Sequence, residues 1–200
     1  RRAPRAPSRR SVGNVSAPPR DRLLALLTEH SFARRRVVLA SGRESDFFID
    51  CKQTVLRAEG HALAGELLLA AVEALGGCAA VAGVELGGCP LASAVALTSF
   101  RAGRPLDAVY VRKEAKDHGS ARLLEGNGHL ATGARIALLE DVVTTGGSTL
   151  KAAAKLRAAG YEIAGVLALV DRLEGGAEAL EQGGLSFRAL YTRRDFIAEA

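Results

Sequence analysis

The chain of 200 residues contains no methionine and only three cysteines, Cys51, Cys78 and Cys89. An odd number of cysteines without C-x-x-C spacing indicates buried free thiols rather than a disulfide framework or a zinc site. Such thiols are typical of a reducing compartment, so we expect a cytoplasmic location. Because methionine is absent, the natural start of translation is not visible. No apolar run reaches about 18 residues without a charge or a breaker, which predicts no membrane span.

Acidic residues are missing from the first 20 positions, which hold six of the arginines. Without this segment the chain has 21 basic and 22 acidic residues, so the net charge of +5 becomes −1. The basic character therefore belongs to the segment, and we expect no nucleic-acid partner. Residues 1–20 have too few apolar side chains to fold and are predicted to be a disordered tail before one domain, residues 21–200. A transit peptide, an extended translation start and an expression remnant all fit this composition.

The most informative stretch combines a strand, two acids, a small-residue loop and a helix. Residues 136–139 are an apolar run with the length of a buried strand, and Glu140 and Asp141 follow it. The loop 144–149 contains only threonine, glycine and serine, and residues 150–156 are helical in character. The glycines allow a close backbone approach, and the first N–H groups of the helix have no intrahelical partner. This end of the helix is therefore suited to bind phosphate.

The same stretch lacks the Gly-Lys-Ser/Thr sequence of a Walker loop. Its two carboxylates cannot bind phosphate, but they suit sugar hydroxyls or a hard cation such as Mg²⁺. Phosphate on one side and hydroxyls on the other describe a ribose 5-phosphate. The alternative is an ordinary strand-to-helix connection whose acids only cap the surface.

The remaining pattern alternates strands and helices and predicts an α/β domain with a mainly parallel sheet flanked by helices. We expect helices over 21–30, 60–75, 91–101, 177–182 and a terminal turn over 194–200, and strands over 47–50, 79–84, 106–111, 163–170 and 187–191. Residues 112–128 form a long, basic, polar segment in which Arg112, Lys113, Lys116 and His118 would place positive charge beside a ligand. A solvated charged loop is the alternative.

Three segments resemble known families. Glu140 to Ser148, EDVVTTGGS, resembles the phosphoribosyl-pyrophosphate signature of type I phosphoribosyltransferases. The sequence RKEAKDHG from Arg112 resembles the catalytic loop of orotate phosphoribosyltransferases, and SGRESDFFIDCK from Ser41 resembles their N-terminal hood. The resemblance covers about residues 21–200. It implies the type I phosphoribosyltransferase fold with a small N-terminal hood.

The resemblance also implies a reaction, which transfers ribose 5-phosphate from phosphoribosyl pyrophosphate to orotate. The products would be orotidine 5′-phosphate and pyrophosphate, in the synthesis of UMP. Mg²⁺ is the implied cofactor, held mainly through the substrate, and no protein ligand is assigned to it. The family also implies a homodimer whose catalytic loop is shared between subunits. No covalent nucleophile is expected.

Site residues follow from the matched motifs. The implied catalytic residues are Lys113, Lys116, His118 and Asp141. The implied phosphoribosyl-pyrophosphate site consists of Arg112, Lys113, Lys116, His118, Glu140, Asp141, Val142, Val143, Thr144, Thr145, Gly146, Gly147 and Ser148. The implied orotate site consists of Phe48, Thr144 and Arg172. One of the adjacent aromatics Phe47 and Phe48 should pack inward, because neighbouring residues of a strand face opposite sides.

The chain departs from the family pattern at two positions. Ala40 and Gly87 stand where many members carry a lysine that contacts phosphate or pyrophosphate. We therefore expect either a subfamily that binds phosphoribosyl pyrophosphate through fewer positive side chains, or a weaker enzyme. The alternative functions are a phosphoribosyltransferase for another base such as a purine, a ligand-sensing regulator without turnover, and a phosphoacceptor domain that uses Asp141.

Overall fold

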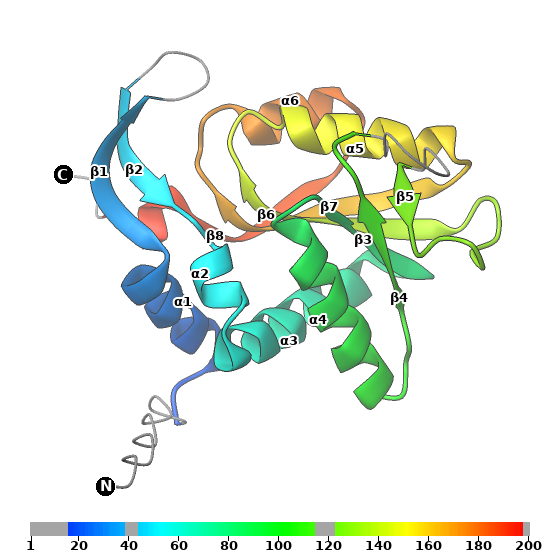
Figure 1. Cartoon of the computed structure of the whole chain (residues 1–200), viewed down its shortest axis with the longest axis horizontal. Helices are drawn as coiled ribbons and strands as arrows, with labels where there is room; N and C mark the ends of the chain where they lie inside the picture. The colour runs from blue at the N-terminus through cyan, green and yellow to red at the C-terminus, as the bar shows by residue number, and fades with distance from the viewer. Residues whose placement is uncertain (1–15, 39–43, 115–122, 198–200) are drawn as a thin grey trace, which may run out of the picture.

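A computed structural model describes residues 16–38, 44–114 and 123–197 (Figure 1). The helices are α1 (Pro19–His30), α2 (Lys52–Val55), α3 (Ala58–Leu75), α4 (Gly88–Arg101), α5 (Gly147–Ala158), α6 (Gly176–Gln182) and the 3₁₀ helix η1 (Arg193–Asp195). The strands are β1 (Phe32–Val38), β2 (Glu44–Ile49), β3 (Ala80–Val84), β4 (Asp107–Val111), β5 (Leu124–Glu125), β6 (Arg135–Val143), β7 (Glu162–Asp171) and β8 (Phe187–Thr192).

The central sheet has six strands in the order β5-β4-β3-β6-β7-β8. All its neighbouring pairs are parallel except β4 and the short β5, which are antiparallel. All five residues of β3 are buried, and so is the run Ile136–Glu140 in β6. Apolar runs of this kind are typical of parallel strands that are covered on both faces. The predicted α/β architecture with a mainly parallel sheet is confirmed.

Helices cover both faces of the sheet, as Figure 1 shows. Helices α5 and α6 lie over one face, and α3 and α4 lie over the other. One buried cluster joins Leu63 and Leu68 of α3 and Leu91 of α4 to Leu139 of β6. A second cluster, on the other face, joins Leu156 of α5 to Leu138 of β6. Because successive side chains of a strand point to opposite faces, β6 contributes to both clusters.

The N-terminal segment forms a small hood beside the sheet. Strands β1 and β2 pair as an antiparallel hairpin that projects from the body (Figure 1). The hairpin is anchored by Phe47, which is fully buried, with its ring 5.2 Å from Phe32 and 5.8 Å from Phe196 between centroids. The Tyr191 hydroxyl donates to the carbonyl of Arg20 at 2.7 Å, which attaches α1 to β8. Helix α1 thus starts at Pro19, two residues before the predicted domain boundary.

Several elements differ from the sequence-based expectation. Strand β6 continues to Val143, whereas the apolar run predicted an end at residue 139, because β7 pairs with β6 as far as the pair Val143–Asp171. Strand β1 begins at Phe32 although Arg34 and Arg35 follow, since both side chains are exposed on a hairpin that projects from the body. Helix α2 and strand β5 are too short to show a hydrophobic period.

The cysteines are free, as expected. Cys51 and Cys89 are buried and Cys78 is partly exposed. Burial raises the pKa of the Cys89 thiol to about 11, which keeps it protonated and inert at neutral pH. Among the helices of the described residues, none is long and apolar enough to cross a membrane.

Candidate active site

The site lies at the carboxyl ends of the parallel strands, where β6 carries Glu140 and Asp141 past the end of β3. The last β3–β6 pair joins Gly83 to Leu139, while β7 stays paired to β6 for four more residues. The acidic pair therefore faces the connection that follows β3 on one side and remains fixed by β7 on the other. Ligands of open α/β sheets bind at such an edge.

Glu140 is the buried member of the pair, with 5% of its surface exposed. Its Oε2 accepts hydrogen bonds from Ser148 Oγ at 3.5 Å and Thr149 Oγ1 at 3.4 Å, both in the first turn of α5. Burial, and then the charge of Asp141, raise the pKa of Glu140 to about 9, from an ordinary value of 4.5. Glu140 is therefore protonated at neutral pH in the ligand-free protein and joins the strand to the helix that follows it.

The loop between β6 and α5 has the backbone that a phosphate site requires. Gly146 is the N-cap of α5 and has a φ of 77°, a left-handed conformation that favours glycine. Within the described residues no side chain caps this helix end. The N–H groups of the first turn, from Gly147 onward, are thus available to an anion, and the helix dipole adds to their attraction. Thr145 and Ser148 are exposed beside them.

The connection from β3 to α4 approaches the acidic pair closely at two glycines. A Cβ atom on Gly88 would lie 2.4 Å from the carbonyl oxygen of Leu139. A Cβ atom on Gly87 would lie 2.1 Å from Cγ of Asp141. The Asp141 carboxylate therefore rests against the backbone of Gly87. The missing lysine at this position has a physical reason, because a side chain there would displace Asp141.

The hood places a cation near Asp141. The Cys51 thiol donates to the carbonyl of Asp141 at 3.8 Å, which brings the start of α2 to the end of β6. Lys52 forms an ion pair with Asp50 at 2.5 Å. The hydrogen bond that Lys52 donates to Asp50, and then the charge of Asp141, raise the pKa of Lys52. Lys52 thus adds positive charge to the edge of the sheet where the lysine at position 87 is absent.

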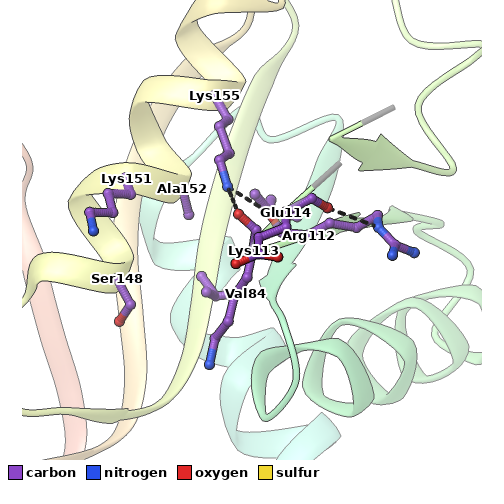
Figure 2. Close-up of a pocket in the computed structure, with 9 residues that line it drawn as sticks. Val84, Arg112, Lys113, Glu114, Ser148, Lys151, Ala152 and Lys155 are labelled. Atoms are coloured by element: carbon purple, nitrogen blue, oxygen red, sulfur yellow. Dashed lines mark hydrogen bonds between the residues drawn. The ribbon is translucent and has the colours of Figure 1, made fainter. Parts of the chain in front are cut away.

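The basic segment begins directly after β4, opposite α5. The backbone N–H of Lys113 donates to Oε2 of Glu85 at 2.8 Å, and Lys155 Nζ donates to the carbonyls of Arg112 and Lys113 at 2.6 and 2.7 Å. Figure 2 shows Lys155 reaching from α5 to these carbonyls, beside Ser148 and Lys151 of the same helix. A cavity of 330 Å³ lies between the helix and this segment.

The hood and the end of β7 meet at the predicted orotate residues. Arg172 donates from Nη2 to the carbonyl of Phe47 at 3.0 Å and forms an ion pair with Glu174 at 2.9 Å. Phe47 is the aromatic that packs inward. Phe48 is half-buried, and the Arg35 guanidinium lies 3.6 Å from the centroid of its ring. Arg172 and the hood strand that carries Phe48 are therefore in contact.

The structure thus brings together the described part of the predicted phosphoribosyl-pyrophosphate site, residues 140–148 with Arg112 and Lys113. Lys116, His118 and Ala40 lie outside the described residues, so their predicted roles stay predictions. Sequence reasoning missed Lys52, Glu85 and Lys155. Glu85 directly follows the predicted strand 79–84, but nothing in the pattern shows that its side chain accepts a hydrogen bond from the N–H of Lys113.

The fold and the site define the class as a type I phosphoribosyltransferase, and comparisons with known proteins narrow it. The orotate phosphoribosyltransferase of Sorangium cellulosum (strain So ce56) is 68% identical over 185 residues, 92% of this chain and 96% of the relative. The Mycobacterium tuberculosis H37Rv orotate phosphoribosyltransferase superposes with a TM-score of 0.76 at 39% identity, over 90% of this chain and 99% of that chain. The same enzyme in complex with phosphoribosyl diphosphate gives a TM-score of 0.72 at 34% identity, over 90% of this chain and 99% of that chain. No family model matches the sequence. The chain belongs to the orotate phosphoribosyltransferase family.

The contact between Gly87 and Asp141 can be tested by adding a side chain. We expect Gly87→Ala and Gly87→Lys each to weaken the binding of phosphoribosyl pyrophosphate about tenfold, because either Cβ displaces the Asp141 carboxylate. The lysine variant should not bind more tightly despite its added charge. Titration calorimetry measures the affinity, and Gly128→Ala is the control because a Cβ at Gly128 meets nothing within 4 Å. Unchanged affinity in both Gly87 variants would contradict this account.

The buried Glu140 predicts how stability depends on pH. The folded protein holds the Glu140 proton up to a pKa of about 9, whereas the unfolded chain loses it near 4.5, so ionisation costs stability as the pH rises through this window. Glu140→Gln cannot ionise. Its melting temperature should therefore exceed that of the wild type at pH 8, by about 2–4 °C for each kcal/mol gained. The difference should shrink toward pH 5. If thermal unfolding gave the same difference in melting temperature between Glu140→Gln and the wild type at pH 5 and pH 8, this explanation would be contradicted.

Proposed function

We propose that the chain transfers ribose 5-phosphate from phosphoribosyl pyrophosphate to orotate, giving orotidine 5′-phosphate and pyrophosphate. The observation that carries the proposal is the 68% identity to an orotate phosphoribosyltransferase over 92% of the chain. The geometry supports it, because a helix end that is suited to bind phosphate and an acidic pair lie side by side at one edge of the sheet. The bond from the sugar to pyrophosphate breaks, and a bond from the sugar to a ring nitrogen of orotate forms.

In this proposal the loop of residues 144–148 binds the 5-phosphate through the N–H groups at the start of α5 and through its hydroxyls. Asp141 is the carboxylate available to the ribose hydroxyls, since it rests on the surface of the β3–α4 connection. Glu140 holds the start of α5 in place by accepting hydrogen bonds from the hydroxyls of Ser148 and Thr149. Negative charge from Asp141 also favours the positive charge that develops on the sugar ring in the transition state.

The departing pyrophosphate needs positive charge. Lys113, at the end of β4, is the described residue that we assign to it, and Arg112 lies beside it. We also assign Lys116 and His118 to this role from their place in the matched motif. Together these groups would stabilise the leaving group, and exclusion of water would protect the reactive sugar from hydrolysis.

We propose Mg²⁺ as the cofactor, which enters with the substrate. The described residues contain no cluster of three or more histidine, cysteine, aspartate or glutamate side chains that could hold a metal ion. Mg²⁺ commonly binds through one or two carboxylates together with substrate phosphates, so Asp141 with the oxygens of phosphoribosyl pyrophosphate fits this ion. The ion would neutralise the pyrophosphate charge.

The orotate end of the site is assigned to Phe48, Thr144 and Arg172. An arginine suits a carboxylate such as that of orotate, because its planar fork donates two parallel hydrogen bonds. The Arg172 head group lies at the hood strand, in contact with the carbonyl of Phe47. Orotate would have to compete with Glu174 for the Arg172 side chain, which is 12% exposed.

The proposed cytoplasmic location remains a prediction.

We further propose that two copies form a homodimer through the face made by α2, α3 and α4. Leu56 and Leu97 are 68% and 49% exposed and line a cavity of 820 Å³ between these helices. Phe100, one turn from Leu97 on α4, is 71% exposed. Contiguous exposed apolar side chains of this size mark interaction surfaces. We assign a second copy of this chain to this face, because the family resemblance implies a homodimer whose catalytic loop is shared between subunits.

The reaction is tested by the absorbance of orotate in the presence of phosphoribosyl pyrophosphate and Mg²⁺. We expect orotate to be consumed and adenine and xanthine, in parallel reactions, to remain. Turnover of a purine instead of orotate would show a phosphoribosyltransferase for another base. Binding of phosphoribosyl pyrophosphate without turnover of any base would favour the regulator.

The dimer is tested by sedimentation equilibrium. We expect the wild type to have twice the 20.9 kDa mass of one chain, and Leu97→Glu to dissociate because a charge enters an apolar interface. Leu173→Glu, the same change at a leucine that is 43% exposed after the end of β7 and outside this face, is the control. A wild type that sediments as a monomer at micromolar concentration would overturn the proposal.

A further inference from the structure

The first residues after β4 are held from two sides. On one side, the N–H of Lys113 donates to Oε2 of Glu85 at 2.8 Å. The N–H of Glu85 in turn donates to the carbonyl of Val111 at 2.9 Å, so Glu85 contacts this backbone twice. On the other side, Lys155 Nζ donates to the carbonyls of both Arg112 and Lys113, at 2.6 and 2.7 Å (Figure 2). The peptide groups on either side of Lys113 are therefore fixed.

Lys155 lies on α5, the helix whose start belongs to the proposed phosphate-binding loop, residues 144–148. It lies eight residues after the first residue of α5, and its side chain crosses to the end of β4. An ammonium group has three donors and no acceptor, so two carbonyls leave it only one further donor. Hydrogen bonds from a charged donor are shorter and stronger than neutral ones. The side chain thus links the helix that binds the 5-phosphate to the backbone that carries Lys113.

We propose that Lys155 is a positioning residue, which holds the Arg112–Lys113 backbone against α5 so that the Lys113 side chain is aimed at the pyrophosphate. This inference rests on the proposed function, in which Lys113 contacts the leaving group. Misplacement of such a group by about 1 Å can cost a hundredfold in rate. In this proposal Lys155 acts through the two carbonyls that it binds, and the Lys113 side chain is the group that contacts the pyrophosphate.

The alternative is that Lys155 serves only the stability of α5, since a cation in the last turn of a helix is favoured by the helix dipole. Arg157 offers a matched control for this alternative. It lies in the same last turn and also donates to two carbonyls, of Gly183 at 3.4 Å and Gly184 at 3.3 Å. Those carbonyls belong to the connection from α6 to β8. A role in helix stability would make the two residues equivalent.

The kinetic test uses Lys155→Met, which keeps the aliphatic stem and removes the ammonium. We expect kcat to fall about tenfold or more while KM for orotate changes less than about twofold. Lys155→Arg should stay within about threefold of the wild type, because it restores a charged donor. Arg157→Met should stay within about twofold, with a melting temperature that changes as much as that of Lys155→Met.

A double-mutant cycle with Lys113→Met separates positioning from other roles. If Lys155 acts by aiming Lys113, Lys155→Met should cost about twofold or less once the Lys113 ammonium is gone. Three kinetic results would each overturn the inference: wild-type kcat in Lys155→Met, an equal loss in Arg157→Met, or a tenfold loss that persists in the Lys113→Met background.

Amide hydrogen exchange tests the contact without turnover. We expect faster exchange at residues 112–114 in Lys155→Met than in the wild type or Arg157→Met, because the backbone is released on the α5 side. Unchanged exchange would overturn the inference whatever the kinetics. If the wild type consumed no orotate, the proposed function would fail, whereas faster exchange in Lys155→Met would still show that Lys155 holds this backbone.

Discussion

The buried carboxyl group of Glu140 is the contact on which the site depends. It lies near the end of the central strand β6, beneath the first turn of α5, and accepts from Ser148 and Thr149 of that turn. A buried carboxyl without such partners would be strongly destabilising, so its presence fixes where α5 can begin relative to the strand. The phosphate loop is the connection between these two elements. Its position therefore follows from the core of the sheet rather than from the loop itself.

Close backbone packing places the remaining parts around this contact. Gly87 and Gly88 let the β3–α4 connection touch β6, so that Asp141 rests on the backbone of Gly87. The hood adds Lys52 from α2, and β4 adds Lys113. Acidic groups for a sugar and basic groups for phosphates are thus separated by a few strand spacings. The proposed function therefore predicts that phosphoribosyl pyrophosphate, which carries both chemistries, spans the sheet edge from the start of α5 to the end of β4.

Local pattern was sufficient for the parts of the fold that repeat. The apolar runs predicted β3, β4, β6, β7 and β8, and the glycine and threonine loop was correctly placed before a helix, α5. The binding of phosphate by this loop stays a prediction. Pattern was insufficient where a contact joins residues far apart in sequence. Lys155 and Lys113 are 42 residues apart, and the carbonyls that Lys155 binds carry no side-chain signature. The end of β6 was also missed, because pairing with β7, not hydrophobicity, carries the strand through Glu140 and Asp141.

The departure at Gly87 shows why a family pattern has to be read against the structure. A lysine would add charge for the pyrophosphate, but its Cβ would occupy the space of the Asp141 carboxylate. Lys52, whose pKa is raised by its hydrogen bond to Asp50 and by the charge of Asp141, brings positive charge from another element, α2. Lys52 is also ion-paired with Asp50. The packing of the Asp141 carboxylate against Gly87 is therefore the feature of this structure that accounts for the glycine.

A crystal structure of the chain with phosphoribosyl pyrophosphate and Mg²⁺ tests the central claim most directly. The account predicts the 5-phosphate within hydrogen-bond distance of the N–H groups at the start of α5, with Asp141 on a ribose hydroxyl and Glu140 still beneath Ser148 and Thr149. A 5-phosphate bound elsewhere, or a Glu140 side chain that has left α5 to bind the ribose, would contradict it.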